Sequence, residues 1–192
     1  MSNRIISRIR TRLAIFRAET GGSAAIEAVL LLPLLFWAYL AMFSFFDMLR
    51  QQSLNYKASS TVADMLSRET DFINDTYISN AHKLYKSMIR SDNNSAIRIS
   101  VLKWSGSQNR FTVDWSKTGG PATALSNAMV AGWQTKLPLM PSDERIILVE
   151  TWSDYHIPFK IGMDDFKMNT FTYVRPRFAP QLPFSNDGGG SV

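Results

Sequence analysis

The residue types that most often carry catalysis are few in this chain, and they are widely spaced. The sequence has no cysteine and two histidines, His82 and His156, so thiolate metal sites, disulfide bonds and a cysteine nucleophile are excluded. His82 lies in a segment of helical spacing without a second ligand nearby, which favours a solvated surface position over a metal ligand. Asp154, Tyr155 and His156 would belong to a catalytic triad only if a serine approached them, and the chain has no G-x-S-x-G motif.

Sequence features that bind ions, nucleotides or sugars are equally sparse. Asp164 and Asp165 are not followed by the ligand spacing of an EF-hand loop. The chain has no G-x-x-x-x-G-K-[ST] motif for binding phosphates. The alternation of tryptophans with polar residues favours core positions over a ligand platform; these are Trp104, Trp115, Trp133 and Trp152. We therefore expect a protein that is not an enzyme and that holds neither a metal ion nor a cofactor.

The residue whose position most requires an explanation is Glu27, at the start of a long apolar segment. No charged residue occurs from Ala28 to Phe46. A carboxylate at the centre of a bilayer costs about 2.5–3.5 kcal/mol on insertion scales, and less near an edge. The nearest arginines lie beyond Gly21 and Gly22. The carboxylate either reaches the lipid headgroups or requires a cation from elsewhere.

The apolar segment itself predicts a membrane-spanning helix. Nineteen residues rise about 28 Å as a helix, close to the thickness of the hydrocarbon core. A buried core helix would usually keep a polar stripe, which this segment lacks. A cleaved secretory signal would have a shorter apolar run, with the small residues after it rather than before it. Arginines precede the segment, so we expect the N-terminus in the cytoplasm and the C-terminal part in the periplasm.

The positive charge of the chain is concentrated before this segment. Residues 1–22 contain five arginines and one acidic residue, so four of the five net positive charges lie there. The high isoelectric point is thus a property of a short basic stretch rather than of a folded face. This distribution argues against a nucleic-acid-binding domain.

The residues around Glu27 resemble the processing site of type IV prepilins, in which a glycine is followed by a glutamate at the fifth mature position. Here Gly22 would be that glycine and Ser23 the new N-terminus. The resemblance implies that a prepilin peptidase removes residues 1–22 as a basic cytoplasmic leader. It also implies that, in a filament, the Glu27 carboxylate of one subunit meets the Ser23 amine of a neighbour. Such a pairing would remove the burial cost and set the register between subunits.

The sequence GGSAAIEAVLLLPLL narrows this resemblance to the TadE-like minor pseudopilins of tight-adherence (Tad/Flp) pilus systems. Pro33 fits the family's spacing after the glutamate. Members often end in an apolar strand, an aromatic-rich stretch with a proline and an Arg-Pro-Arg signature, here residues 145–152, residues 155–158 and Arg175-Pro176-Arg177. The resemblance implies a pilin-like fold and a location in the bacterial inner membrane or in an extracellular pilus. The implied partners are the peptidase, other minor pilins, the major Flp pilin, and an assembly platform with its ATPase.

Four residues within the span have positions that suggest roles in lipid or in helix packing. Pro33 removes one hydrogen bond from a helix and kinks it, although a tolerated membrane proline is an equal alternative. Trp37 and Tyr39 fall in mid-span rather than at an interface, so we expect them, with Phe43, to pack against other membrane helices.

The remaining chain predicts an α+β fold in which one long helix packs on about four antiparallel strands. Helical spacing continues past the span, with a transmembrane part over residues 23–49 and an amphipathic part over residues 50–70. A periplasmic head over residues 71–183 and a flexible tail over residues 184–192 follow. In the head we expect a second helix after Asn74, a short helix with Leu125, Met129 and Trp133, and strands around residues 97–102, 111–116, 146–149 and 171–173.

Two other classes of protein remain open from sequence. An uncleaved single-pass protein could bind a ligand or partner through its periplasmic head. A membrane-tethered hydrolase would require Asp154, His156 and a serine to converge.

Overall fold

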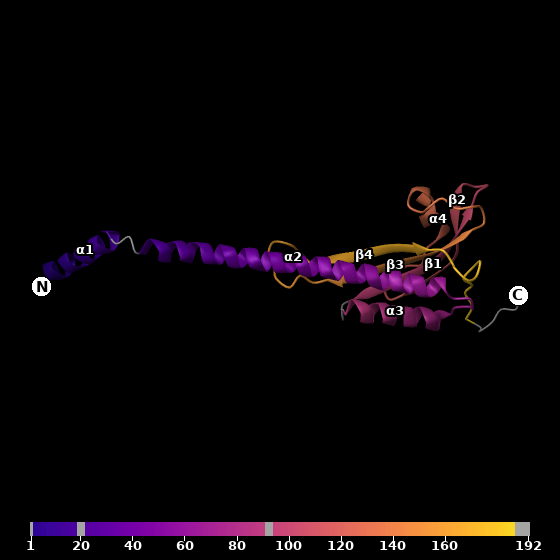
Figure 1. Ribbon diagram of the computed structural model, residues 1–192, viewed down its shortest axis with the longest axis horizontal. Helices are drawn as coiled ribbons and strands as arrows, with labels where there is room; N and C mark the ends of the chain where they lie inside the picture. Colours follow the sequence, from indigo (N-terminus) through magenta and orange to yellow (C-terminus); the bar gives the residue numbers. More distant parts are fainter. Residues whose placement is uncertain (1, 19–21, 91–93, 187–192) are drawn as a thin grey trace. The chain divides into compact units, whose positions relative to one another are not determined.

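The computed structural model describes residues 2–18, 22–90 and 94–186. The chain divides into two compact units, Met1–Phe45 and Phe46–Val192, and each is treated by itself. The first contains helix α1 (Ser2–Ala18) and the N-terminal part of helix α2 (Ser23–Ser67). The second contains the rest of α2, which lies against a four-stranded sheet (Figure 1). The predicted α+β fold and the single long helix are confirmed.

Helix α2 is 45 residues long and continues through Pro33 without ending. Its end is fixed by local contacts: the backbone N–H groups of Arg68 and Glu69 donate to the carbonyl oxygens three residues earlier. Ser67 Oγ also donates to the carbonyl of Asp64, at 2.8 Å. These bonds tighten the last turn, so α2 ends where the chain must reverse toward the next helix.

Helix α3 (Asp75–Ile89) begins at the predicted cap. The Asn74 side chain accepts a hydrogen bond from Tyr77 N at 2.9 Å, a cap worth about 0.5–2 kcal/mol. The helix ends at Arg90, which has a left-handed backbone conformation and donates its N–H to Ser87. Its buried face consists of Ile78, Ala81, Tyr85 and Ile89.

The sheet has the strand order β2-β1-β3-β4, with every neighbouring pair antiparallel. Its strands are β1 (Ser95–Ser105), β2 (Arg110–Gly119), β3 (Arg145–Tyr155) and β4 (Phe166–Val174). All four predicted strands are present, and each extends beyond its predicted core. The central pair β1 and β3 supplies most of the buried residues of the sheet, because these two strands are covered on both faces.

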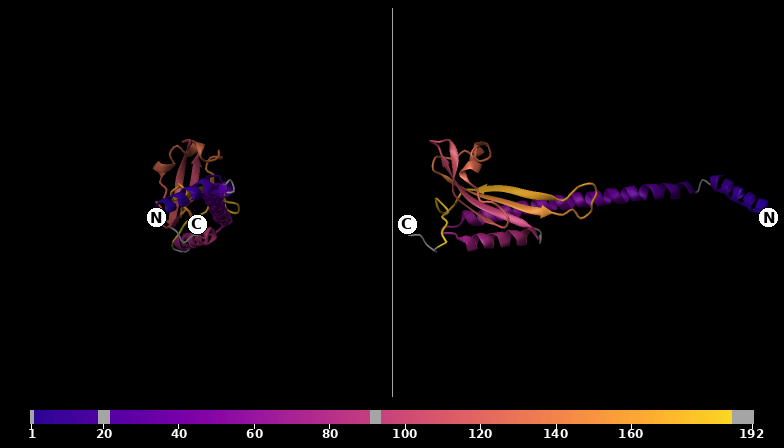
Figure 2. Two further views of the ribbon diagram at one scale, coloured as in Figure 1. Left: turned by 90° about the vertical axis from the view of Figure 1, so that its left-hand side faces the viewer. Right: turned by 180° about the vertical axis from the view of Figure 1, so that it is seen from behind.

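One face of the sheet packs against α2 and α3. Ile99 and Val149 lie next to each other in the register of β1 and β3, and both belong to the same fully buried cluster as Val62 of α2 and Tyr85 of α3. The view from behind in Figure 2 shows both helices on this side of the strands. The predicted apolar stripe of the amphipathic segment is therefore confirmed as the core contact of α2.

The opposite face is covered by the segment between β2 and β3. Leu102, Leu148 and Val130 share its buried cluster. We expected one short helix here, and the structure has instead a single turn α4 (Asn127–Val130) followed by the 3₁₀ turn η2 (Trp133–Thr135). Gly132, with φ of 87°, separates the two turns, because this left-handed conformation ends the helical path.

A bulge in β2 changes the sequence-based assignment of its faces. Val101 pairs with Trp115 whereas Leu102 pairs with Val113, so Asp114 is an additional residue in this strand. Simple alternation predicts Phe111, Val113 and Trp115 on one face. In the structure, Trp115 packs against the buried cluster between the sheet and helices α2 and α3. Val113 packs against the buried cluster on the opposite face, under the segment between β2 and β3.

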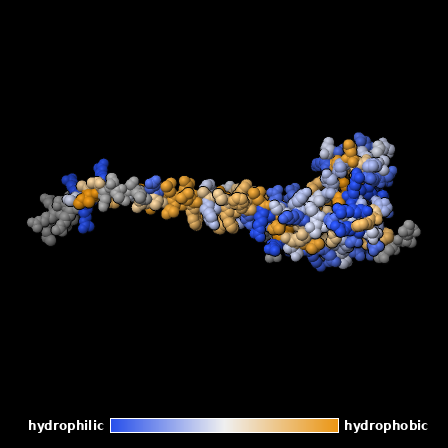
Figure 3. Space-filling view, in the orientation of Figure 1, coloured by the Kyte–Doolittle hydropathy of each residue, from blue (hydrophilic) through white to orange (hydrophobic). Residues whose placement is uncertain are grey.

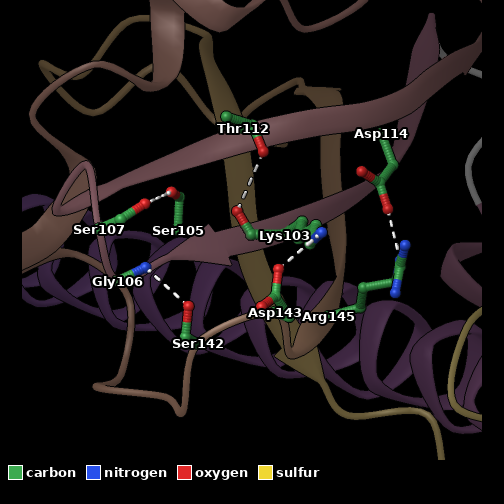
Figure 4. A network of polar contacts seen from close by, with 9 residues as sticks. All are labelled: Lys103, Ser105, Gly106, Ser107, Thr112, Asp114, Ser142, Asp143 and Arg145. Carbon is green, nitrogen blue, oxygen red and sulfur yellow. Dashed lines mark hydrogen bonds and ion pairs between the residues drawn. The ribbon is translucent and has the colours of Figure 1, made fainter.

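Polar contacts hold the hairpin end of the sheet together (Figure 4). Arg145 Nε donates to Asp114 Oδ2 at 2.6 Å, so the bulged residue is tied to the first residue of β3. Lys103 pairs with Asp143 at 2.8 Å, and Gly106 N donates to Ser142 Oγ at 3.1 Å. These contacts join the β1–β2 hairpin to the turn before β3.

The segment after β4 returns to the start of α3. Ile73 and Phe184 form a parallel β-bridge, and Asn186 bonds to Asp75 at both its backbone and its carboxylate. Residues 184–186, predicted as part of a flexible tail, thus belong to the head. Residues 187–192 lie outside the described residues.

Candidate functional site

The predicted processing segment lies where α2 begins. Gly22 directly precedes the helix, and Ser23 is its first residue. A Cβ atom built on Gly22 meets no atom within 4 Å. The described residues around Gly22 therefore leave room for a Cβ atom at this position. Gly21, the other glycine of the motif, lies outside the described residues.

Glu27 lies one helical turn beyond Ser23 and is exposed. None of the ion pairs among the described residues includes Glu27.

The apolar segment exposes its large side chains on all sides. Trp37, Tyr39 and Phe43 expose 54%, 65% and 48% of their surfaces, and Figure 3 shows a predominantly hydrophobic surface along this part of the helix. Part of α2 is long and apolar enough to cross a membrane. Exposure of this much apolar surface to water is unfavourable, which is compatible with a helix that crosses a membrane.

The Arg-Pro-Arg signature fastens the C-terminal segment to the end of α2. The Arg177 backbone N–H donates to the carbonyl of Ser67 at 2.8 Å, and its guanidinium lies 3.3 Å from Asp64. Arg175 lies 3.3 Å from Glu144. Pro176 between them is partly buried. The signature thus satisfies a carbonyl group at the C-terminus of α2, where the backbone lacks partners within the helix.

A buried ion pair, which sequence reasoning missed, crosses the central strands. Arg98 and Glu150 are direct register partners on β1 and β3. Arg98 Nε lies 2.6 Å from Glu150 Oε2, and the two side chains are 8% and 9% exposed. Arg98 also donates to the carbonyl of Thr123 at 2.9 Å, and its guanidinium lies 5.0 Å from the ring centre of Trp152. The alternation of residues around Arg98 predicts a polar face of the strand. It does not reveal that residues 119–141 cover this face of the sheet.

A surface groove of about 380 Å³ lies beside this ion pair. Its lining combines the Trp152 ring with Arg98, Asp154, Lys167 and Met129. Trp152 is therefore not purely a core residue, in contrast to Trp104, which is buried. An aromatic face beside charged groups of both signs suits a small polar ligand or a peptide side chain.

The two histidines lie in different environments. His82 is half-buried rather than solvated, with Nε2 at 3.0 Å from the Ser95 carbonyl oxygen. Burial lowers the pKa of His82 below its ordinary value. His156 Nδ1 lies 2.6 Å from Asp165, whereas Asp154 pairs with Lys167 at 3.7 Å. The carboxylate at hydrogen-bond distance from His156 Nδ1 is thus that of Asp165, whereas a triad would use that of Asp154. In the part of the chain that the structure describes, no cluster of three or more acidic or histidine side chains is placed to hold a metal ion.

The His156–Asp165 pair gives a testable pH dependence. The hydrogen bond with His156, aided by that from Ile157 N–H, lowers the pKa of Asp165. A carboxyl group with a lowered pKa in the folded state stabilises that state above about pH 4, and this contribution is lost as pH falls through the lowered value. We expect His156→Ala to raise the pKa of Asp165 in an NMR titration. Asp143, whose pKa is lowered mainly by Lys103, should titrate as before, and an unchanged Asp165 would contradict the assignment.

Comparisons with protein-family models, with curated proteins and with solved structures find no match for this chain.

Proposed function

We propose that this chain is a TadE-like minor pseudopilin that assists the assembly of a Tad/Flp-type pilus. The observation that carries the proposal is the start of α2. A small-residue motif, an exposed carboxylate without an ion-pair partner among the described residues, and an exposed apolar helix follow one another there. The same helix continues into the core of the head through Ala58 and Val62.

Processing and assembly are linked in this proposal by one electrostatic pairing. Cleavage after Gly22 would create an amine on Ser23, with an ordinary pKa near 8 and thus a positive charge at neutral pH. The exposed Glu27 carboxylate of one subunit would form an ion pair with the Ser23 amine of a neighbouring subunit. The pairing would offset the cost of placing both groups near lipid. Trp37, Tyr39 and Phe43 would pack against the helices of other pilins.

The decisive experiment is mapping of the N-terminus. The protein is purified from the membranes of its native host, with and without a functional prepilin peptidase, and its intact mass is measured. We expect a chain that begins at Ser23 when the peptidase is present and at the original N-terminus when it is absent. A chain that keeps its basic leader in both membranes would overturn the proposal.

The Glu27 pairing predicts a separate phenotype. We expect Glu27→Ala to be processed normally but to reduce pilus number, because the Ser23 amine loses its partner. Glu27→Asp, which keeps the charge on a shorter side chain, serves as the matched variant and should retain more pili. Pili are counted by electron microscopy, and processing is followed by mass. Wild-type pilus numbers for Glu27→Ala would contradict the pairing.

The groove beside Arg98 favours one alternative, an uncleaved membrane-anchored protein that binds a ligand through its head. Its combination of Trp152 with charged groups is the supporting observation. The same mapping separates the two functions, because the alternative predicts an intact leader in the functional protein.

A further inference from the structure

The loop between β3 and β4, residues 156–165, exposes apolar side chains at one end of the head. Phe159, Met163 and the adjoining Phe166 expose 42%, 37% and 41% of their surfaces. They lie close together in sequence, and Gly162, with φ of 102°, bends the chain between the first two. Three large apolar side chains exposed within eight residues give this end of the head an apolar character that a lipid surface could cover.

The base of this loop is fixed to the first residues after the apolar run. Tyr155 Oη donates to Asp47 Oδ2 at 2.8 Å, and Asp47 is the first charged residue after Glu27. Met48 packs against Tyr155, Ile157 and Met168. Both strands that carry the loop are thus held at the level where the predicted membrane span ends.

Strand β3 runs antiparallel to α2, so the loop that follows β3 lies near the end of the apolar run. Ser153 of β3 donates to Asn55 of α2 at 2.8 Å, and Tyr155 donates to Asp47. Later residues of β3 therefore contact earlier residues of α2, which are closer to its apolar segment. Figure 1 shows the β3–β4 loop at the end of the sheet away from the β1–β2 hairpin.

We propose that residues 156–165 form a membrane-contacting loop whose Phe159 and Met163 side chains enter the lipid headgroup region of the outer leaflet. Residues 156–165 contain one lysine, Lys160, and two aspartates, Asp164 and Asp165, so the loop has no excess of positive charge. Apolar burial rather than attraction to anionic lipid therefore drives the contact. Together with α2, the loop would give the head a second attachment to the bilayer and limit its rotation about the helix axis. This inference requires only that α2 spans a membrane and does not depend on cleavage or on a pilus.

The absence of native cysteine makes a single-label test direct. Met163→Cys in the full chain is labelled with a nitroxide and reconstituted in phosphatidylcholine vesicles. Ser107→Cys, an exposed position in the β1–β2 hairpin, is the matched control at the other end of the sheet. Collision of each label with oxygen, which partitions into lipid, is compared with collision with a water-soluble nickel chelate. Near-UV circular dichroism verifies that both variants are folded.

We expect oxygen collisions to dominate at position 163 and nickel collisions to dominate at position 107. The result at position 163 should persist in high salt, because the loop has no excess of positive charge that would attract anionic lipid. A label at position 163 that is as accessible to nickel as the label at position 107 would overturn the lipid contact and leave the surface for a protein neighbour. Unprocessed protein serves equally well, so failure here is independent of the N-terminal mapping.

Discussion

Gly22→Arg is expected to abolish processing, so that the protein accumulates in the membrane with its leader attached and pilus assembly is lost. The peptidase implied by the family resemblance cleaves after a glycine. The long cationic side chain of Gly22→Arg would occupy the space at the cleavage position that glycine leaves empty. Because a Cβ atom on Gly22 meets nothing within 4 Å, the substitution should not disturb the fold of the described residues. Intact-mass measurement of membrane-purified protein checks the outcome.

A matched variant separates loss of the glycine from addition of charge. Ala18→Arg adds the same positive charge to an exposed position in α1 and leaves Gly22 in place, so it should be processed to Ser23. Processing of Gly22→Arg at the wild-type level would show that the motif is not the cleavage site. Failure of both variants would instead indicate that leader charge controls processing.

Glu150→Ala is expected to destabilise the head more than substitutions of its exposed ion pairs. The change would leave the buried Arg98 guanidinium without its carboxylate, 2.6 Å away in the wild-type protein. The Thr123 carbonyl and the Trp152 ring remain as partners, but neither carries a compensating charge. Breaking a buried pair by removing one partner typically costs about 3–5 kcal/mol. Guanidinium unfolding of the full chain in detergent, followed by near-UV circular dichroism, measures the loss.

Two further variants test whether the uncompensated charge causes this effect. The double variant Arg98→Met with Glu150→Leu removes both charges and should lose less stability than Glu150→Ala alone. Arg68→Ala removes an exposed partner of Asp64 and should change the free energy of unfolding by less than about 1 kcal/mol. Equal losses for the single and double variants would indicate that packing volume, rather than charge, dominates at this site.

The Arg-Pro-Arg sequence near the C-terminus has structural partners that the family resemblance does not specify. The sequence identifies Arg175, Pro176 and Arg177 by resemblance alone. The structure gives the two arginines physical partners, because Arg177 lies at the C-terminus of α2 and Arg175 lies near Glu144. These contacts give the two arginines a role in holding the head together.

The sequence by itself determined the features that depend on neighbouring residues. The apolar run and its continuing stripe define α2, the Asn74 cap defines the start of α3, and alternating residues define the four strands. Local chemistry suffices for these elements because residues a few positions apart create each pattern. The Gly22–Glu27 motif likewise lies within six consecutive residues.

Only the tertiary structure decided which distant residues meet. The bulge at Asp114 moved Trp115 to the other face, His156 paired with Asp165 rather than Asp154, and Glu150 met Arg98 under a covering loop. The β3–β4 loop came to lie at the end of the apolar run through contacts between residues more than one hundred positions apart. Such contacts depend on strand register and chain closure, which alternation along a single strand does not encode.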